Sequence, residues 1–139
     1  MIYVLDSSVA VKWALPEADS DKAIALREDV AKKVHEIIAP DVFASEIAHA
    51  LTRAERKKII PLGDALKHVY DILQDGPALK PFLPLLPRAI EISSATKAAI
   101  TDCLFTALAE QENCEYVTAD DRVIKTLHGF PIVSLASLY

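Results

Sequence analysis

The sequence predicts an α/β fold in which a mainly parallel central sheet of four to five short strands is flanked by helices on both faces. Three observations predict it. Short apolar runs alternate with segments of helical periodicity along the whole chain, which is typical of strand–helix units. The opening run, residues 2–5, is continuously apolar, as expected of a strand that is buried on both faces. A length of 139 residues with 52% hydrophobic residues suits one domain, which we expect to span residues 1–139.

The amino-terminal half contains signals for two strands and four helices. Residues 2–5 form the first strand, and a helix that begins at Val9, after a cap from Ser7 or Ser8, ends before Pro16. The remaining elements of this half are expected over residues 17–36 as helix, 37–40 as strand, 42–58 as helix and 64–73 as helix.

The carboxy-terminal half is interrupted by proline. Residues 74–77 are a predicted loop. The proline-rich stretch 82–87 favours an edge strand or an extended connection, because proline cannot donate a hydrogen bond to a neighbouring strand. After it we expect helices over residues 88–99, 102–112 and 121–127 and strands over residues 115–118 and 131–134.

Composition narrows the function classes. No apolar stretch approaches the roughly 20 residues of a membrane span, and no signal peptide is visible, so the cytoplasm is the expected location. Cys103 and Cys114 are expected to be structural thiols, because their spacing does not favour a disulfide. The formal net charge of −5 argues against nucleic-acid binding unless several acids gather at a metal site. One basic group is either a solvated helix end or a rim that contacts phosphate: Arg53, Arg56, Lys57 and Lys58.

Four acidic residues occupy positions where a shared site is possible. Asp6 ends the first strand and Asp120 follows the strand at 115–118, and ligands of open α/β sheets bind beyond the carboxyl ends of the strands. Glu46 and Asp102 lie near helix starts, and the apolar neighbours of Asp102 predict partial burial, which a carboxylate tolerates only with a partner such as a metal ion. Each acid alone is also explained as a helix cap, a turn residue or half of an ion pair. The hypothesis of a site therefore depends on all four converging.

Four segments, each containing one of these acids, occur in the order and spacing of a known family: Ile2–Trp13, Pro40–Leu51, Thr101–Glu110 and Tyr116–Asp121. On these segments the whole chain resembles the PIN-domain nucleases, and most closely the VapC toxins of bacterial and archaeal toxin–antitoxin systems. Thr101 departs from the pattern, because a Tyr often stands before the third acid. We expect this departure to change local packing more than metal binding.

The resemblance implies a single PIN-like domain that acts as a metal-dependent endoribonuclease and hydrolyses RNA phosphodiester bonds. It implies one or two Mg²⁺ or Mn²⁺ ions, which prefer oxygen ligands, held by Asp6, Glu46, Asp102 and Asp120. Asp121 is the alternative fourth ligand, or a helper that acts through water. Other residues have either a supporting or a plain structural role, with Ser7, Ser8 and Thr118 as partners of the carboxylates and Lys12 as a contact to phosphate.

The resemblance also implies protein partners, because VapC toxins belong to type II toxin–antitoxin systems. A VapB-type antitoxin and a second copy of the chain, giving a homodimer, are expected beside the RNA substrate. One apolar face suits either an interface or the core: Ile59, Ile60, Leu62, Leu66, Val69 and Leu73. Two other functions stay open on the same fold, a non-catalytic binding or scaffold module and a metal-dependent nuclease for structured DNA. A flavodoxin-like receiver is disfavoured, because Asp6-Ser7-Ser8 lacks its paired acids.

Overall fold

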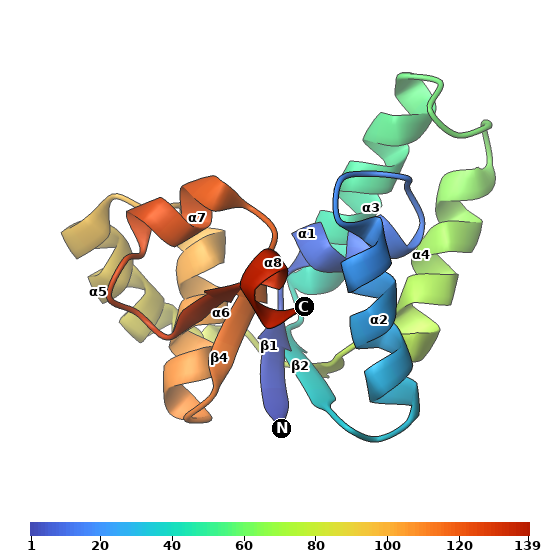
Figure 1. The fold of residues 1–139 in the computed structure, drawn as a ribbon. Helices are drawn as coiled ribbons and strands as arrows, with labels where there is room; N and C mark the ends of the chain where they lie inside the picture. The colour runs from blue at the N-terminus through green and yellow to red at the C-terminus, as the bar shows by residue number, and fades with distance from the viewer.

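The computed structural model describes residues 1–139 as one parallel sheet with helices on both of its faces (Figure 1). The five strands are β1 (Ile2–Leu5), β2 (Glu36–Pro40), β3 (Ala78–Lys80), β4 (Glu115–Thr118) and β5 (Ile132–Ser134). Their order is β3-β2-β1-β4-β5, and every neighbouring pair is parallel. The chain builds one side of β1 first and then the other, so the strand order reverses between β1 and β4. Open α/β sheets bind ligands beyond the carboxyl ends at such a point.

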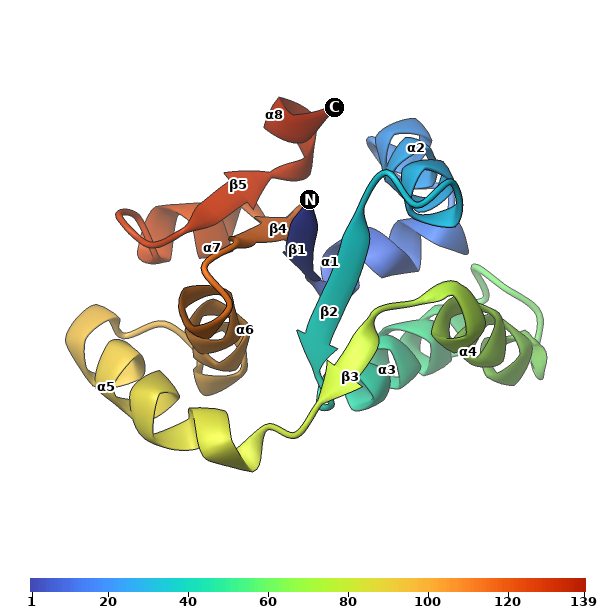
Figure 2. The same ribbon diagram turned by 90° about the horizontal axis from the view of Figure 1, so that it is seen from below.

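Helices cover the sheet on both faces, with α5 and α6 on one face and α2 on the other (Figure 2). The fold class predicted from the sequence, a single PIN-like α/β domain, is confirmed. None of the helices combines the length and the apolar character that crossing a membrane requires. The helical segments are α1 (Ser7–Ala10), the 3₁₀ segment η1 (Val11–Trp13), α2 (Ser20–Ala31), α3 (Phe43–Arg56), α4 (Asp64–Asp75), the 3₁₀ segment η2 (Leu83–Leu85), α5 (Leu86–Thr96), α6 (Ile100–Gln111), α7 (Asp121–Thr126) and α8 (Leu135–Leu138).

The core is one continuous cluster of 33 buried hydrophobic residues. In α6 every residue from Cys103 to Ala109 is buried, because this helix lies between the sheet and α5. Burial of each large apolar side chain contributes about 1.5–3 kcal/mol to stability. The same helix carries Asp102 in its first turn, so that acid is presented by a rigidly packed element. Cys103 and the partly buried Cys114 are free thiols, as predicted.

The first helix begins two residues earlier than predicted, at Ser7. Asp6 occupies the N-cap position that was expected for Ser7 or Ser8, and its backbone carbonyl accepts a hydrogen bond of 3.1 Å from the amide of Val9. The Asp6 side chain nevertheless makes no capping hydrogen bond. Its carboxylate is therefore available for contacts outside the helix.

The next helix is shorter than the predicted range 17–36. It is α2, and left-handed backbone conformations at Asp19 and Lys33, each with φ of 62°, lie just outside its two ends. Left-handed residues break the repeating helical geometry, and the apolar periodicity of the sequence does not reveal them.

The predicted edge strand is displaced. The strand at this edge is β3, which pairs with β2, whereas residues 82–87, predicted as an edge strand or extended connection, contain η2 and the start of α5. Pro87 is tolerated in the first turn of α5, because the amide hydrogen that it lacks would have no partner there. All three side chains of β3 are exposed, so this strand lacks the apolar pattern that reveals a strand. The short helix α8, capped by the hydroxyl of Ser134, was also not predicted.

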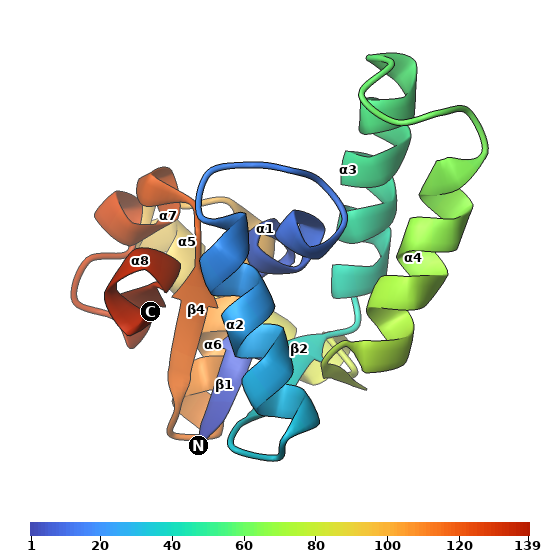
Figure 3. The same ribbon diagram turned by 45° about the vertical axis from the view of Figure 1, so that its right-hand side comes forward.

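Helices α3 and α4 pair to form an arm, residues 43–75, that rises beyond the carboxyl edge of the sheet (Figure 3). The apolar face predicted here is divided. Its inner part is buried in the core or packed against it: Ile60, Val69 and Leu73. Its outer part is exposed, with 58% of Ile59, 91% of Leu62 and 62% of Leu66 accessible. The outer part therefore forms an exposed apolar surface at the end of the arm.

Candidate metal centre

Acidic side chains from four elements meet in one hollow at the carboxyl edge of the sheet. Asp6 follows β1, Asp120 follows β4, and Glu46 and Asp102 lie in the first turns of α3 and α6. All four line a hollow of about 370 Å³ at the point where the strand order reverses. The structure thus brings together the four acids that the sequence singled out, although 114 positions separate the first from the last.

Asp6 is the most deeply placed of the four, with only 5% of its surface exposed. Its Oδ2 accepts hydrogen bonds from the hydroxyl of Ser8 at 2.7 Å and from the hydroxyl of Thr118 at 2.6 Å. These two donors fix the orientation of the carboxylate at the floor of the hollow. The contacts that the sequence predicted for Ser8 and Thr118 are therefore present.

The hydroxyls continue into a network that ties the strand ends together. Ser8 Oγ accepts a hydrogen bond of 3.1 Å from the amide of Ala119, and Thr118 Oγ1 accepts one of 3.1 Å from the amide of Asp120. On the opposite wall, Ser7 Oγ donates to Glu46 Oε1 at 3.3 Å. Each of the three predicted supporting hydroxyls therefore contacts one of the acids directly.

The negative charges in the hollow disfavour ionisation of the acids that line it. Burial raises the pKa of Glu46 to about 7, and the charges of Asp6 and Asp102 add to this effect. Burial also raises the pKa of Asp102 to about 6, again with a contribution from Asp6. The pKa of Asp6 is raised by burial, against the opposing effect of the Thr118 and Ser8 hydroxyls. A cation bound between such acids would stabilise their ionised forms.

The chemistry of the donor set fits a hard divalent cation, which prefers carboxylate oxygens. The present side-chain positions hold the acids apart, because no three His, Cys, Asp or Glu side chains lie close enough to hold one ion. One oxygen of Asp120 is already engaged, since its Oδ1 accepts a hydrogen bond of 2.9 Å from the Arg122 amide as the cap of α7. An ion held by three or more of these acids would therefore require acidic side chains to rotate toward one another.

Two basic side chains line the same hollow. Lys12 is held 3.5 Å from Glu17, and only 12% of its side chain is exposed. Arg122 is 82% exposed and lies 3.5 Å from Oδ2 of Asp120. Lys12 was among the predicted residues and Arg122 was not. The only signal for Arg122 in the sequence is its place directly after two acids at a helix start.

Two other predicted groups lie elsewhere. Asp121, the alternative fourth ligand, lines a neighbouring hollow and not the acidic one. The basic run at the end of α3 is also remote, because none of its members lines the acidic hollow: Arg53, Arg56, Lys57 and Lys58. This location agrees with a solvated helix end, where cations suit the helix dipole.

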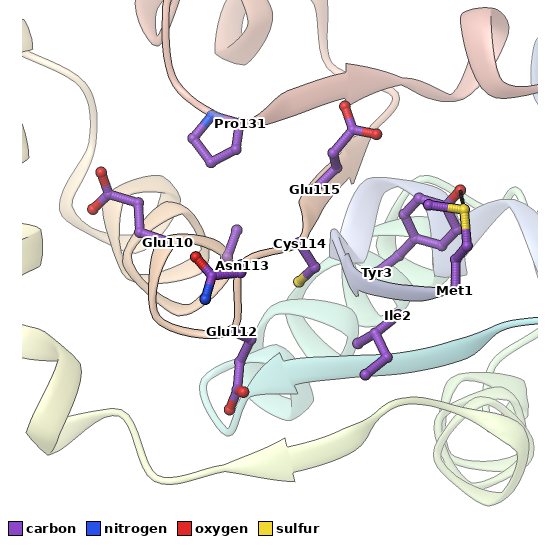
Figure 4. A pocket seen from close by; sticks show the side chains of 10 residues that line it. Met1, Ile2, Tyr3, Glu110, Glu112, Asn113, Cys114, Glu115 and Pro131 are labelled. Carbon is purple, nitrogen blue, oxygen red and sulfur yellow. Dashed lines mark hydrogen bonds between the residues drawn. The ribbon is translucent and has the colours of Figure 1, made fainter.

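A larger hollow, of about 660 Å³, lies at the opposite edge of the sheet (Figure 4). It is formed at the amino ends of β1, β4 and β5, where the Tyr3 hydroxyl contacts the sulfur of Met1 at 3.7 Å. Of its acids, Glu110 is bound to Arg88 at 2.8 Å, and Glu112 and Glu115 are exposed. It therefore lacks the buried, mutually interacting carboxylates of the acidic hollow.

Comparison with known proteins agrees with this fold. Comparison with curated protein sequences gives no match. Among solved structures, PAE2754 from Pyrobaculum aerophilum is similar with a TM-score of 0.72 and 21% identity, over 99% of this chain and 95% of that one. VapBC2 from Rickettsia felis, bound to a promoter DNA fragment, is similar with a TM-score of 0.69 and 15% identity, over 96% of this chain and 98% of that one. VapBC-1 from nontypeable Haemophilus influenzae is similar with a TM-score of 0.63 and 11% identity, over 98% of this chain and 99% of that one. The sequence profile of the PIN domain matches residues 3–127, and the chain therefore belongs to the PIN domain family.

Proposed function

We propose that this protein is a divalent-metal-dependent endoribonuclease and the toxin component of a type II toxin–antitoxin system. One observation carries the proposal: Asp6, Glu46, Asp102 and Asp120 converge on a single hollow, in which burial and the neighbouring negative charges raise the pKa of Asp6, Glu46 and Asp102. Membership of the PIN domain family supports a nuclease. The two VapBC complexes of the same fold support a toxin with an antitoxin partner.

In this proposal the four acids hold one or two Mg²⁺ or Mn²⁺ ions. A bound divalent cation would supply Lewis-acid stabilisation of the phosphate and lower the pKa of the attacking water. Asp6 contributes a carboxylate already oriented by Thr118 and Ser8. Burial and the charges of Asp6 and Asp102 raise the pKa of Glu46 to about 7, and a bound cation would favour its ionised form.

The two basic side chains of the hollow then serve substrate binding. Lys12 is nearly buried and held by Glu17, which places its ammonium group at a fixed position on the wall. The side chain of Arg122 is 82% exposed, and its guanidinium can exchange Asp120 for a phosphate oxygen once that carboxylate turns toward a cation. A chain with a net charge of −5 thus presents positive charge to RNA locally.

Cleavage of labelled oligonucleotides by the purified protein tests the activity. We expect single-stranded RNA to be cut with Mg²⁺ or Mn²⁺ and not with EDTA, and Asp6→Asn to abolish the cleavage. Asp21→Asn is the matched control, because Asp21 is exposed on α2 and lines neither hollow. Cleavage of structured DNA instead of RNA would favour the DNA nuclease, and no cleavage of either would favour a binding or scaffold module.

The toxin assignment has a separate test in cells. Expression of the chain should arrest bacterial growth, and Asp6→Asn should remove the arrest. Co-expression with the small protein encoded beside its gene should also restore growth, if that protein is the antitoxin. Normal growth under wild-type expression, with active nuclease in the extract, would contradict the toxin role while leaving the nuclease in place.

A further inference from the structure

A second, smaller hollow adjoins the acidic one. It has a volume of about 180 Å³ and shares Lys12 and Ala119 with the acidic hollow, so these residues form a common wall. Thr118, whose hydroxyl donates to Asp6, also lines it. The small hollow therefore begins directly beside the proposed reaction centre.

The walls of the small hollow differ in character from those of the acidic one. Apolar side chains from the two helices that flank it, Ile124 of α7 and Leu135 of α8, form part of its lining. Acceptor groups at its edge come from Asp19 and Asp121. Single-stranded RNA is recognised by seating a planar base on an apolar wall and pairing its polar edge with side chains. Carboxylates repel phosphate, so this lining suits a base and not the RNA backbone.

Asp121 is the acceptor that is free to act. It makes no ion pair and no side-chain hydrogen bond, whereas Asp19 lies 3.9 Å from Lys22. Its neighbour Asp120 faces the acidic hollow, so the two adjacent acids serve different hollows. A carboxylate only accepts hydrogen bonds, and therefore it pairs with base edges that donate.

We propose that the small hollow binds the base next to the scissile phosphate and that Asp121 selects bases with an amino group over uracil. The proposal rests on the proposed nuclease function. Cytosine, adenine and guanine each carry an amino donor, whereas uracil presents carbonyl acceptors with one ring N–H. Lys12, on the common wall, is placed to contact the phosphate that joins the nucleotides in the two hollows.

Cytidine and uridine provide the sharpest test, because they differ by the exchange of an amino donor for a carbonyl acceptor. Single-stranded RNA oligomers identical except for one of these nucleotides on either side of the cleavage site would be compared by kcat/KM. We expect the wild type to prefer cytidine at one of the two flanks by roughly 5- to 100-fold, the usual range for a paired base edge. Asp121→Asn introduces an amide that donates to the uracil carbonyl, so the preference should fall at least roughly fivefold or invert.

Asp21→Asn should leave the preference as in the wild type. Binding of the same oligomers, measured by fluorescence anisotropy in the Asp6→Asn background with and without Asp121→Asn, gives a second readout that needs no cleavage. A wild type that cuts no RNA but whose binding preference depends on Asp121 would refute the nuclease and keep the base site. The base site would be overturned if Asp121→Asn left the preference between cytidine and uridine unchanged. Cleavage decides this where RNA is cut, and binding decides it where no RNA is cut.

Discussion

The hydroxyl of Thr118 donates a hydrogen bond of 2.6 Å to Oδ2 of Asp6, across 112 positions of sequence. It joins the carboxyl ends of β1 and β4, the two strands between which the strand order reverses. The same hydroxyl accepts the amide of Asp120, so one buried side chain positions two of the four acids. Thr118 is completely buried, which leaves this hydroxyl no alternative partner in water.

Thr118→Val, which keeps the shape of the side chain and removes the hydroxyl, tests this relationship. We expect a loss of about 1–3 kcal/mol in the free energy of unfolding, because Asp6 and the Asp120 amide lose a buried partner. Affinity for Mn²⁺, measured by calorimetry, should fall roughly 10- to 100-fold. Thr118→Ser keeps the hydroxyl, so it should retain most of the stability and most of the affinity for Mn²⁺. Thr126→Val is the control, because its hydroxyl bonds only to the carbonyl of Arg122 within α7.

The raised pKa of Glu46 predicts that the metal-free protein loses stability as the pH rises. Its folded-state pKa is about 7 against a usual 4.5, so the folded state binds the proton more tightly than the unfolded state. The stabilisation is complete below about pH 4.5 and is lost by about pH 7. Melting temperatures in EDTA should therefore fall across this window, and Glu46→Gln should flatten the fall while Asp21→Asn does not. Added Mg²⁺ should raise the melting temperature more at pH 8 than at pH 5. A rise of stability with pH in EDTA that Glu46→Gln leaves unchanged would contradict the electrostatic account.

Lys12→Met is expected to weaken RNA binding through loss of one phosphate contact. The apparent affinity should become less sensitive to salt, with the slope of log K against log [salt] reduced by about 0.7, the value for one contact to a single strand. Lys125→Met is the control and should leave the slope within error, because Lys125 is exposed in the last turn of α7 and lines neither the acidic nor the small hollow. An unchanged slope in Lys12→Met would assign this nearly buried lysine to the ion pair with Glu17 alone.

The sequence located the four acids because each occupies a place that topology makes special. Asp6 follows an apolar run that becomes the central strand, and Glu46 and Asp102 open helices whose apolar faces are unmistakable. The sequence favoured Asp120 as the fourth acid through the family resemblance and kept Asp121 as the alternative. In the structure Asp120 lines the acidic hollow and Asp121 the neighbouring one, because adjacent residues at a helix start point in different directions.

Some of the elements and residues that were not predicted have exposed side chains. The strand β3 has no buried residue and depends only on backbone hydrogen bonds to β2. Arg122 likewise has no periodic pattern around it, since it is 82% exposed and acquires a role only through the hollow beside it. Apolar patterning reports burial, so it locates the core and the acids that interrupt it, and it is silent about surface groups.

The exposed outer part of the α3–α4 arm predicts self-association. Leu66 is 62% exposed on this arm, beside Ile59 and Leu62. We expect the wild type to be a homodimer at micromolar concentration by size-exclusion chromatography with light scattering, and Leu66→Glu to be a monomer. Leu83→Glu is the matched control, because Leu83 is 66% exposed but lies in η2, away from the arm. A monomeric wild type would leave this apolar surface for a different protein, and a dimeric Leu66→Glu would place the interface elsewhere.

Tyr116 lies beneath the acids with its ring stacked on Phe105, at 5.4 Å between centroids, and its hydroxyl is buried without a hydrogen bond of normal geometry. The hydroxyl is nevertheless close enough to lower the pKa of Asp6. Tyr116→Phe keeps the stacked ring and removes a hydroxyl that has no hydrogen bond of normal geometry, so we expect unfolding in denaturant to report stability within about 1 kcal/mol of the wild type. The pKa of Asp6 should rise, and the acidic limb of the pH–activity profile should move to higher pH. Tyr3→Phe, at the opposite edge of the sheet, should leave that limb in place. A destabilised Tyr116→Phe with an unchanged pH profile would mean that the hydroxyl supports the core and not Asp6.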